Sequence, residues 1–520
     1  MKSKKIILSL LLSGSIVGFA HAQSVDDAVI ISKDENPASA RIKGMGNVQT
    51  ALGGDISSIN GNPAGLGFYS RSDVNITFDY LQNNNKTNFL GTNSSSNKGN
   101  LGIAQAGVVF NFPSRNLGYH GWQSTSIGIS YNKRQNFNNS WVYDGVNNET
   151  SFVNNLTDLM ADDSDFRNDF RNDFRKSNLV EIFPTAADGY FPLAFQEGKH
   201  QVNDVLTKGN HNNTSLAFGA NYNNTFYIGA TLGFSFFRYE RSKIFEENGW
   251  TMTPDEVREV NPNSAYANPA NPELYRFLDK SYQLLDDYSQ ITEGSGIDLK
   301  LGMIFKPALD WNIGLTIKTP TWNTISESTR AFTDVSYFPD MDSNTSFHTY
   351  ESALYSSAQD YSISTPWRFA LGATKFFDRG LLSAEAEYIT YNSTRYTSPT
   401  STNSFINVNN YISEDLQGAF NVRIGGEYLL NSLVSARAGF NYFGNPYKYA
   451  EETNYNGSVG LGFKLSNTMY MDVAVVHQVN SYSTAPYTLS GFWHDLGSYE
   501  PVADLTHRRT NALLTLGARF

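Results

Sequence analysis

Apolar and polar residues alternate along much of this chain after Asp73. In the segment LDWNIGLTIK, residues 309–318, the apolar residues Leu309, Trp311, Ile313, Leu315 and Ile317 are each followed by a polar residue or glycine. A β-strand has a period of two residues, so this segment has one apolar face and one polar face. Residues 297–306 alternate in the same way, and Pro307 and Ala308 join the two segments. The pattern predicts an antiparallel hairpin.

The same alternation recurs from end to end of the region after Asp73. The further predicted strands are residues 73–82, 101–112, 125–137, 214–222, 225–239, 367–377, 382–391, 420–429, 434–442, 459–465, 469–477 and 509–520. The total is about fourteen, and an even number is typical of bacterial outer-membrane barrels.

The lengths of the connections support a membrane barrel. Long polar segments follow the odd-numbered strands, at residues 83–100, 138–213, 240–290, 319–365, 392–418, 443–456 and 478–508, whereas most even-numbered strands are followed by two or three residues. Outer-membrane barrels have long external loops and short periplasmic turns, whereas a soluble β-sandwich has no reason to obey this parity. We therefore predict an all-β fold, a transmembrane antiparallel up-and-down barrel.

Two of the long segments have apolar residues at helical spacing. Phe166, Phe170 and Phe174 recur every four residues, and so do Leu274, Leu278 and Tyr282, with Leu285 following. On a helix, this spacing makes one apolar stripe. We predict helices at residues 165–176 and 272–288, whose stripes either pack on neighbouring loops or form an apolar landing surface at the barrel mouth.

The N-terminal residues have the order of a secretory signal. Lys2, Lys4 and Lys5 precede an apolar run over residues 6–19, and Ala20-His21-Ala22 follows. This order predicts cleavage after Ala22. No later apolar run approaches the about 18 residues of a membrane helix, so strands must do any spanning.

Residues 38–68, ASARIKGMGNVQTALGGDISSINGNPAGLGF, are rich in glycine and keep neither a helical nor a strand period. Such a segment cannot form a core alone, so we predict an irregular plug that the strands enclose. The expected organisation is a signal peptide at residues 1–22, an N-terminal hatch at residues 23–72 and a barrel at residues 73–520.

Composition narrows the possible functions. Without the three signal lysines, 36 basic residues face 50 acidic ones, a net charge of -14, which argues against nucleic-acid binding. Cysteine is absent, which excludes disulfides, thiolate metal sites and a lipid-modified cysteine. Aromatic residues make up 14% of the chain while its mean hydropathy is only -0.39, as in a barrel with one apolar face.

Catalytic chemistry is weakly represented. The eight histidines have no metal-ligand spacing, and no G-x-S-x-G, P-loop or Rossmann motif occurs in the required context, so we expect no enzyme activity, metal or cofactor. Glu385 and Glu387, both on the polar face of one predicted strand, could be a catalytic pair. The other interpretation is that charges of both signs in the lumen pair with Arg41, Lys43 and Asp55 and anchor the hatch. A hydrolase with Ser and His on different strands remains open.

Several motifs carry a resemblance to a known family. They are Ala40-Arg41-x-x-Gly44-Met45-Gly46, Leu52-Gly53-Gly54-Asp55 and Asn62-Pro63-Ala64-Gly65-Leu66, followed downstream by Thr365-Pro366-Trp367-Arg368-Phe369, Arg423-x-Gly425-x-Glu427-Tyr428 and Arg437-Ala438-Gly439-Phe440. The block resembles the N-terminal hatch of the FadL/TodX family of outer-membrane transporters for long-chain fatty acids and aromatic hydrocarbons. The likeness spans nearly the whole mature chain.

The resemblance implies a fourteen-stranded barrel in the outer membrane of a Gram-negative bacterium. It would take a hydrophobic ligand from outside and release it sideways into the membrane lipid, at an inward kink of the third strand. Asn62, Pro63 and Ala64 would lie near this gap, and Gln23, Ser24 and Val25 would touch the ligand. The loops 240–290 and 319–365 would form the capture groove. The longer second loop, residues 138–213, departs from the family pattern.

Two functions follow from this comparison. The first is passive uptake of a hydrophobic compound such as a long-chain fatty acid. The alternative is a surface receptor or shuttle that binds a protein partner in secretion through the enlarged loops.

Overall fold

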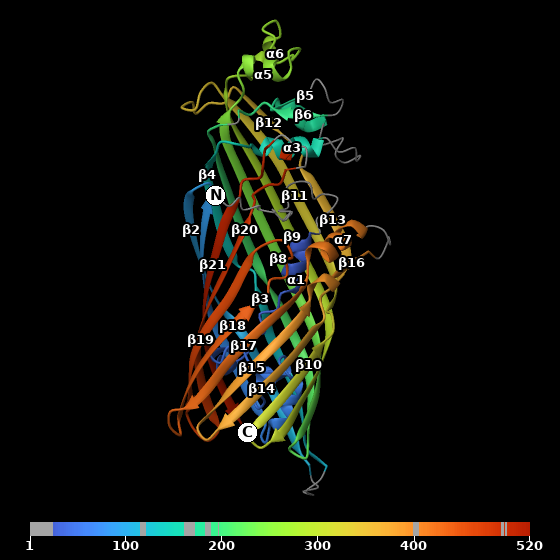
Figure 1. Ribbon diagram of the computed structural model, residues 1–520, viewed down its shortest axis with the longest axis vertical. Coiled ribbons are helices and arrows are strands. Elements are labelled where there is room, and N and C mark those ends of the chain that lie inside the picture. Colours follow the sequence, from blue (N-terminus) through green and yellow to red (C-terminus); the bar gives the residue numbers. More distant parts are fainter. Residues whose placement is uncertain are drawn as a thin grey trace, which may run out of the picture.

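The computed structural model describes residues 24–114, 121–160, 172–182, 189–195, 197–398, 405–489, 493–494 and 497–520. Most of these residues form one antiparallel sheet that closes on itself (Figure 1). The first strand, β1 (Asp73–Phe89), pairs with β2 and also with the last strand, β21 (Ala503–Arg519). The predicted antiparallel barrel is therefore confirmed.

The strands follow one another around the wall in sequence order. They are β1, β2 (Thr92–Pro113), β3 (Trp122–Asn136) continued by β4 (Asn139–Asn147), β7 (Lys199–Tyr222), β8 (Phe226–Trp250), β9 (Ser281–Ala308), β10 (Trp311–Lys318) continued by β11 (Trp322–Phe338), β13 (Tyr355–Ser364) continued by β14 (Arg368–Phe377), β15 (Gly380–Thr390) continued by the short β16 (Arg395–Thr397), β17 (Gly418–Leu429), β18 (Val434–Phe443), β19 (Glu452–Lys464), β20 (Met469–Thr484) and β21. With continued strands counted once, the described residues make fourteen, as the alternation predicts.

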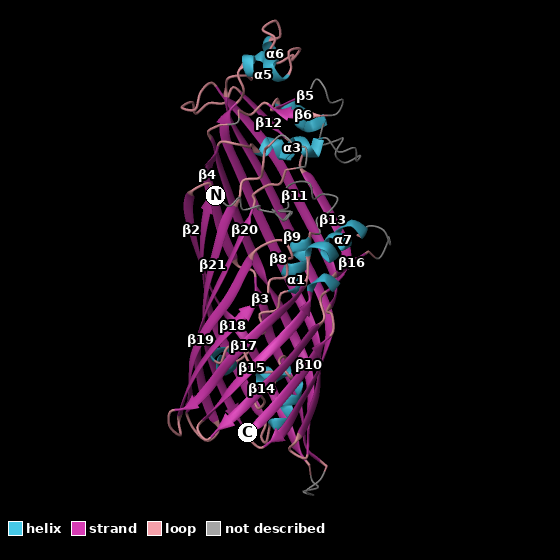
Figure 2. Cartoon of the chain, viewed as in Figure 1, coloured by secondary structure: helices cyan, strands magenta, loops and turns pink. Residues whose placement is uncertain are grey.

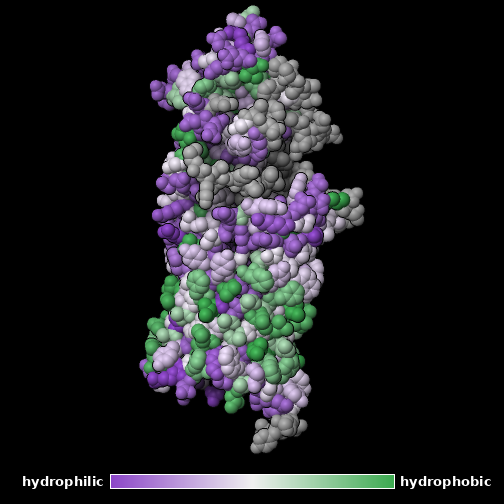
Figure 3. Space-filling model, in the orientation of Figure 1, coloured by the Kyte–Doolittle hydropathy of each residue, from purple (hydrophilic) through white to green (hydrophobic). Residues whose placement is uncertain are grey.

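The alternation places apolar side chains on the outside of the wall. On β10, Trp311 and Ile313 are 40% and 42% exposed, whereas Asn312 between them is buried. The same holds around the barrel, and hydrophobic residues dominate the half of the visible face that carries the short turns (Figure 3). An apolar belt on the outside of the wall and polar side chains on the inside are the arrangement of a barrel that faces lipid.

The strands run further than the alternating segments, which corrects the loops predicted at residues 83–100, 240–290 and 319–365. The hairpin of β1 and β2 turns only at Leu90 and Gly91, both with positive φ. Likewise, β8 reaches Trp250, and β11 and β13 lie within the loop predicted at residues 319–365. These extensions carry polar residues on both faces, so their hydropathy does not alternate although their backbone is extended.

The helix predicted at residues 272–288 is also wrong beyond its first turn. Helix α6 (Pro272–Tyr275) is short, because Asp279 takes a positive φ of 55° and β9 starts at Ser281. Phe166 and Phe170 of the other predicted stripe lie outside the described residues. The remaining elements between strands are α3 (Phe152–Met160), η4 (Arg175–Ser177), β5 (Val180–Ile182), β6 (Tyr190–Pro192), α5 (Pro254–Val260), β12 (His348–Glu351), η5 (Tyr391–Ser393) and α7 (Ile406–Asp415).

Four short helical turns precede β1 and lie inside the strands (Figure 2). They are α1 (Val25–Ser32), α2 (Ala40–Gly44), η2 (Ile56–Ile59) and η3 (Pro63–Phe68). Each begins where a side chain of Ser24, Ser39, Asp55 or Asn62 accepts a hydrogen bond from a backbone N–H of its first turn. These are the residue types that start helices, so the local sequence sets the path of the hatch. None of the helices in the described part of the chain is long and apolar enough to cross a membrane.

Candidate ligand cavity and wall break

The hatch contacts the wall through Asn62. Its Nδ2 donates to the carbonyl oxygens of Thr50 (2.6 Å) and, on β9, Met303 (3.1 Å), and its Oδ1 accepts from the backbone N–H of Ala64 (3.1 Å). Pro63, with no N–H to satisfy, takes the first position of η3. The motif therefore joins the hatch to β9 of the wall.

Glycines on the inner face of the wall let the hatch approach this closely. A Cβ atom at Gly229 on β8 or Gly302 on β9 would overlap Asn62 and Pro63. The backbone of Met45 and Gly46 similarly lies against wall glycines of β17 and β18, Gly425 and Gly439. Several strands thus carry their glycine at the height of the hatch, and the backbones pack without side chains between them.

The three residues predicted to anchor the hatch have different partners. Arg41 pairs with Glu427 of β17 at 3.1 Å, whereas Lys43 Nζ donates to the carbonyl oxygen of Glu35 at 2.7 Å. Asp55 accepts from the Ser39 hydroxyl at 2.9 Å and caps η2. Burial lowers the pKa of Lys43 to about 8. Of the three, Arg41 makes an ion pair with the wall, whereas the hydrogen bonds of Lys43 and Asp55 described above join parts of the hatch to one another.

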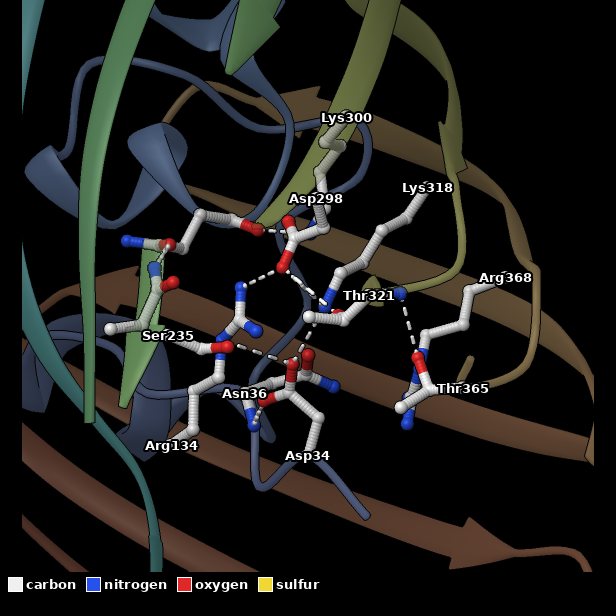
Figure 4. Close-up of polar contacts among 12 residues, drawn as sticks. Asp34, Asn36, Arg134, Ser235, Asp298, Lys300, Lys318, Thr321, Thr365 and Arg368 are labelled. Atoms are coloured by element: carbon white, nitrogen blue, oxygen red, sulfur yellow. Dashed lines mark hydrogen bonds and ion pairs between the residues drawn. The ribbon is translucent and has the colours of Figure 1, made fainter. Parts of the chain in front are cut away.

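Charged residues of both signs from the hatch and from the wall meet inside the barrel (Figure 4). Arg134 of β3 pairs with Asp298 of β9 at 2.8 Å and with Asp34 of the hatch at 3.7 Å. Lys318 of β10 contacts Asp34 at 3.4 Å and Asp298 at 3.6 Å. We call Asp34, Arg134, Asp298 and Lys318 the ionic layer.

The ionic layer ties the hatch to the third strand. Burial alone would raise the pKa of the Asp34 carboxyl, but Lys318 and Arg134 together hold it well below its usual value. The backbone N–H of Glu35 also donates to the carbonyl oxygen of Arg134 at 3.0 Å. The hatch and the third strand are therefore joined at Arg134 both by an ion pair and by a backbone hydrogen bond.

Immediately after Asn132 the wall loses one of its ladders. The pairing of β2 with β3 runs from Pro113 opposite Ser124 to Gln105 opposite Asn132 and then ends. The upper part of β2, residues 92–104, still pairs with β1, while β3 and β4 continue along β7 with a bulge between Lys133 and Gln135. We call this interruption the β2–β3 break.

Side chains of β1 replace the lost ladder. Asn83, Asn85 and Thr87, on the inner face of β1, donate to the backbone carbonyl oxygens of Asn138, Ser140 and Val142 at 2.7, 2.5 and 2.5 Å. Donors and acceptors are each spaced by two residues, the strand period. The segment 138–142 therefore passes inside β2 and lies against the inner face of β1, so the third strand turns inward here.

Two polar contacts span the β2–β3 break itself. Lys133 pairs at 2.7 Å with Asp79 of β1, reaching past Gly102 of β2, and Asn136 donates to Asn100 of β2 at 3.0 Å. On the outer face beside these contacts, Leu101 and Ile103 are 75% and 40% exposed. The lower end of the break thus adjoins the apolar belt.

A cavity of about 330 Å³ lies between the break and α1. Gln135, Asn136, Phe137 and Asn139 from the inward turn form one side, and Asp26, Val29, Ile30 and Lys33 of α1 form another. Its volume is near the lower limit of small-molecule sites. The residues after the bulge therefore separate this cavity from the break.

The ligand-contacting residues predicted at the mature N-terminus lie close to this cavity. Ser24 and Val25 begin α1, and the Ser24 carbonyl oxygen accepts from the Tyr396 hydroxyl at 3.1 Å. Val25 packs against an apolar cluster that also contains Val29, Tyr396 and Ile412. Neither residue borders the cavity directly, and Gln23 lies outside the described residues.

The end of the barrel away from the hatch carries a second apolar core, the lid cluster. Its members include Phe152, Phe174, Phe191, Phe245, Leu278, Tyr282, Tyr337, Tyr487 and Trp493. Buried Glu247 of β8 fixes the start of α3, accepting from the backbone N–H of Phe152 at 2.8 Å and from the Tyr282 hydroxyl at 2.6 Å. The loops 240–290 and 319–365, predicted to form a capture groove, contribute to this core.

The candidate catalytic pair is bonded to other groups. Glu385 accepts from the backbone N–H groups of Gln49 and Thr50 at 3.0 and 2.8 Å, and both Glu385 and Glu387 contact Arg423 at 2.5 Å. These contacts give the pair a structural role at the hatch. No group of three or more potential metal ligands occurs among the described residues.

Solved structures share this architecture. The toluene transporter TodX of Pseudomonas putida aligns with a TM-score of 0.51 over 94% of this chain and 99% of its own, at 13% sequence identity. A FadL homologue of Pseudomonas aeruginosa aligns with a TM-score of 0.53 over 93% of this chain and 98% of its own, at 12% identity. The chain has the fold of these two proteins. No protein-family model and no curated protein matches the sequence.

Sequence reasoning did not single out the residues of the break. Lys133, Asp79 and Arg134 lie within predicted strands, and the sequence assigned them no role. The available signal was the run Asn83-Asn84-Asn85, polar on both faces where the barrel should be apolar outside. Such a run shows where a strand leaves the apolar zone of the membrane. Its partners are backbone carbonyl oxygens of residues 138–142, and a backbone acceptor cannot be recognised from the sequence.

Proposed function

We propose that this protein is an outer-membrane channel for passive uptake of hydrophobic or amphipathic small molecules. The resemblance of the sequence suggests long-chain fatty acids or aromatic compounds, and a structural neighbour is a toluene transporter. The observation that carries the proposal is the position of the cavity: residues 135–137 and 139 form part of its lining and also border the β2–β3 break.

The proposed route bends sideways because the hatch occupies the axis. Hatch residues such as Ile56, Ile59 and Leu66 are fully buried, and the hatch backbone abuts the wall glycines. A solute entering from the loop end would reach the cavity and then pass between Lys133 and residues 99–104 of β2. Leaving towards lipid is favourable for an apolar solute, by about 25 cal/mol per Å² of surface kept out of water.

Opening this exit requires breaking the Lys133–Asp79 pair, whose side chains are 9% and 4% exposed. Replacing Lys133 by Ala removes the side chain that spans the break. We expect Lys133→Ala to raise the initial uptake rate of labelled oleate by about 2- to 10-fold, because a buried pair must otherwise open first. The measurement is uptake by cells of a host that lacks its own fatty-acid channel.

The matched control is Lys375→Ala, which removes a lysine paired with Asp310 at the short-turn end of the barrel. This control should leave the rate unchanged. Uptake equal to that of cells without the protein, for oleate and for a labelled aromatic compound alike, would contradict the channel. It would favour the receptor for a protein partner as the function.

A further inference from the structure

The outer face of the wall carries an apolar groove that begins beside the β2–β3 break, and we call it the exit groove. Its volume is about 650 Å³, within the range of small-molecule sites. Tyr131 and Ile129 of β3 and Ala106 of β2 line one end. Ala106 pairs with Tyr131, and the next rung, Gln105 with Asn132, is the last one before the break. A solute that leaves through the break therefore emerges at this end of the groove.

From the break, the exit groove crosses β2, β1 and β21 and ends at the start of β20. Ile76 of β1 pairs with Leu516 of β21, and Ala518 of β21 pairs with Met469 of β20, so the lining continues from strand to strand. From β3 to β20 there are four strand spacings of about 4.8 Å, or about 19 Å in all. Along each strand the lining covers at most three consecutive residues, about 7 Å. This elongated shape fits an extended chain better than a compact ring.

The exit groove is deep where small residues take outward positions. Ala106 and Ala518 line it, whereas Leu516, the next outward residue on β21, is large and exposed. Asn75 and Ser130 border the groove from the inner face of the wall, where they are 3% and 1% exposed. In the described part of the chain, no charged residue lines the groove. The surface that it offers to a solute is therefore apolar along its length.

Polar side chains lie at the end of the exit groove that meets the break. Two residues beyond Tyr131, Lys133 pairs with Asp79 across the break at 2.7 Å, and Asn136 donates to Asn100 at 3.0 Å. A polar group is stable among such side chains and is costly to place in hydrocarbon. The site thus has a polar end at the exit and an apolar path leading away from it.

We propose that the exit groove holds the alkyl chain of an amphipathic solute that has passed the β2–β3 break, while its polar end stays among the polar side chains of the break. Lipid tails are as apolar as the groove, so the hydrophobic effect does not favour one over the other. The preference for the groove comes from the polar end and from close contacts along the lining. This inference rests on the proposed function, because it assigns the site that receives the solute after exit.

Photochemical cross-linking tests where the solute lies. The full chain is placed in nanodiscs of dioleoylphosphatidylcholine with palmitate whose chain carries a diazirine, and mass spectrometry locates the adducts. A second outer groove, of about 740 Å³, includes residues 424–426 and 436–440 and lies on other strands, away from the break. We expect palmitate adducts at residues 106–108, 129–131 and 516–518 to be at least 5-fold more frequent than adducts in the second groove. Phosphatidylcholine with the same photoreactive chain should label both grooves equally.

Two variants fill the exit groove from opposite ends. Ala106→Trp places a large ring beside the break, and Ala518→Trp places one two strands away, where it leaves the break itself untouched. Each should lower the palmitate adducts in the exit groove by at least 5-fold. Ala438→Trp, which adds the same ring to the second groove, is the matched control and should leave these adducts unchanged. Equal melting temperatures would show that all three variants fold.

Three results would overturn the inference. Equal palmitate labelling of both grooves would mean ordinary contact with the bilayer, and the same preference for phosphatidylcholine would make the exit groove a site for membrane lipid. Unchanged labelling in both Ala106→Trp and Ala518→Trp would also reject it. Uptake by cells separates this inference from the proposed function. Preferential labelling without uptake would reject the channel and keep the groove, whereas uptake with equal labelling would reject the groove and keep the channel.

Discussion

Single residues in this barrel set how closely the hatch fits the wall. A Cβ atom added to one of the glycines that face the hatch would overlap hatch atoms. At Gly457 of β19, in contrast, an added Cβ atom would meet no other atom within 4 Å. A methyl group is therefore tolerated or not according to the face on which it appears. The sequence shows the glycines, but only the structure shows which of them touch the hatch.

Gly229→Ala tests this fit. The added methyl would overlap the Pro63 backbone, so we expect a loss of about 1–3 kcal/mol in the stability of hatch docking, as in other overpacked sites. Hydrogen exchange of residues 60–68 should rise in this variant. Gly457→Ala is the control, and equal exchange in the two variants would show that the close fit is not required.

Asp26 of α1 confers a pH dependence on the N-terminal helix. Burial raises the pKa of its carboxyl from 3.8 to about 6, although Tyr447 donates to it at 2.8 Å. A raised carboxyl pKa stabilises the docked state fully below about pH 4, and this stabilisation is lost as the pH rises through 6. The shift is equivalent to up to about 3 kcal/mol.

We therefore expect α1 to dock more firmly at pH 5 than at pH 8. A spin label at Ile30→Cys, unique because the chain has no cysteine, should be less mobile at the lower pH. Asp26→Asn should remove most of this difference. Label mobility that rises on acidification would mean that another group controls docking.

At the scale of elements, β4 is the decisive departure from a regular barrel. Its residues continue the third strand and pair with β7 on one edge, but on the other edge side chains of β1 replace the ladder with β2 along residues 138–142. The resemblance in the sequence led us to expect an inward kink in the third strand. The structure shows where this kink lies and which residues hold it. The sequence could not, because the side chains of β1 bond to backbone carbonyl groups, which every residue has.

Replacing the three rungs together, Asn83→Ala, Asn85→Ala and Thr87→Val, should free this segment. Each rung is a hydrogen bond worth about 1 kcal/mol, so the triple variant should lose roughly 3 kcal/mol of local stability. Hydrogen exchange of residues 138–142 should then rise by about 100-fold. Asn88→Ala, on the exposed face of the same strand, is the control, and unchanged exchange in the triple variant would show that the ladder with β7 alone holds the segment.

Other elements were predictable to different degrees. Strands in the apolar belt followed from the period of two, and the short turns followed from the parity of the connections. The upper strands did not, because polar residues on both faces remove the alternation. The helix expected after Pro272 stopped early because tertiary pairing of β9 outweighed the local apolar stripe.

The whole molecule combines a plugged axis with a polar seam in its wall. Arg134 contacts the hatch, belongs to the ionic layer and lies beside the inward turn of the third strand. The hatch is therefore bonded to the wall next to the β2–β3 break. The lid cluster fills one end of the barrel, and the hatch packs against the wall glycines at the other. Between them, the cavity is bordered by residues next to the β2–β3 break. The central claim is that solutes leave the barrel through this break.

Cross-linking the break tests that claim most directly. In a chain without native cysteines, Asn100→Cys with Asn136→Cys can be joined by a short bifunctional thiol reagent that reductant removes. Phe110→Cys with Ile127→Cys, a ladder pair of the same strands, is the control. We expect uptake to fall to background in the cross-linked first pair, to recover on reduction and to persist in the control. Undiminished uptake through a cross-linked break would contradict the account.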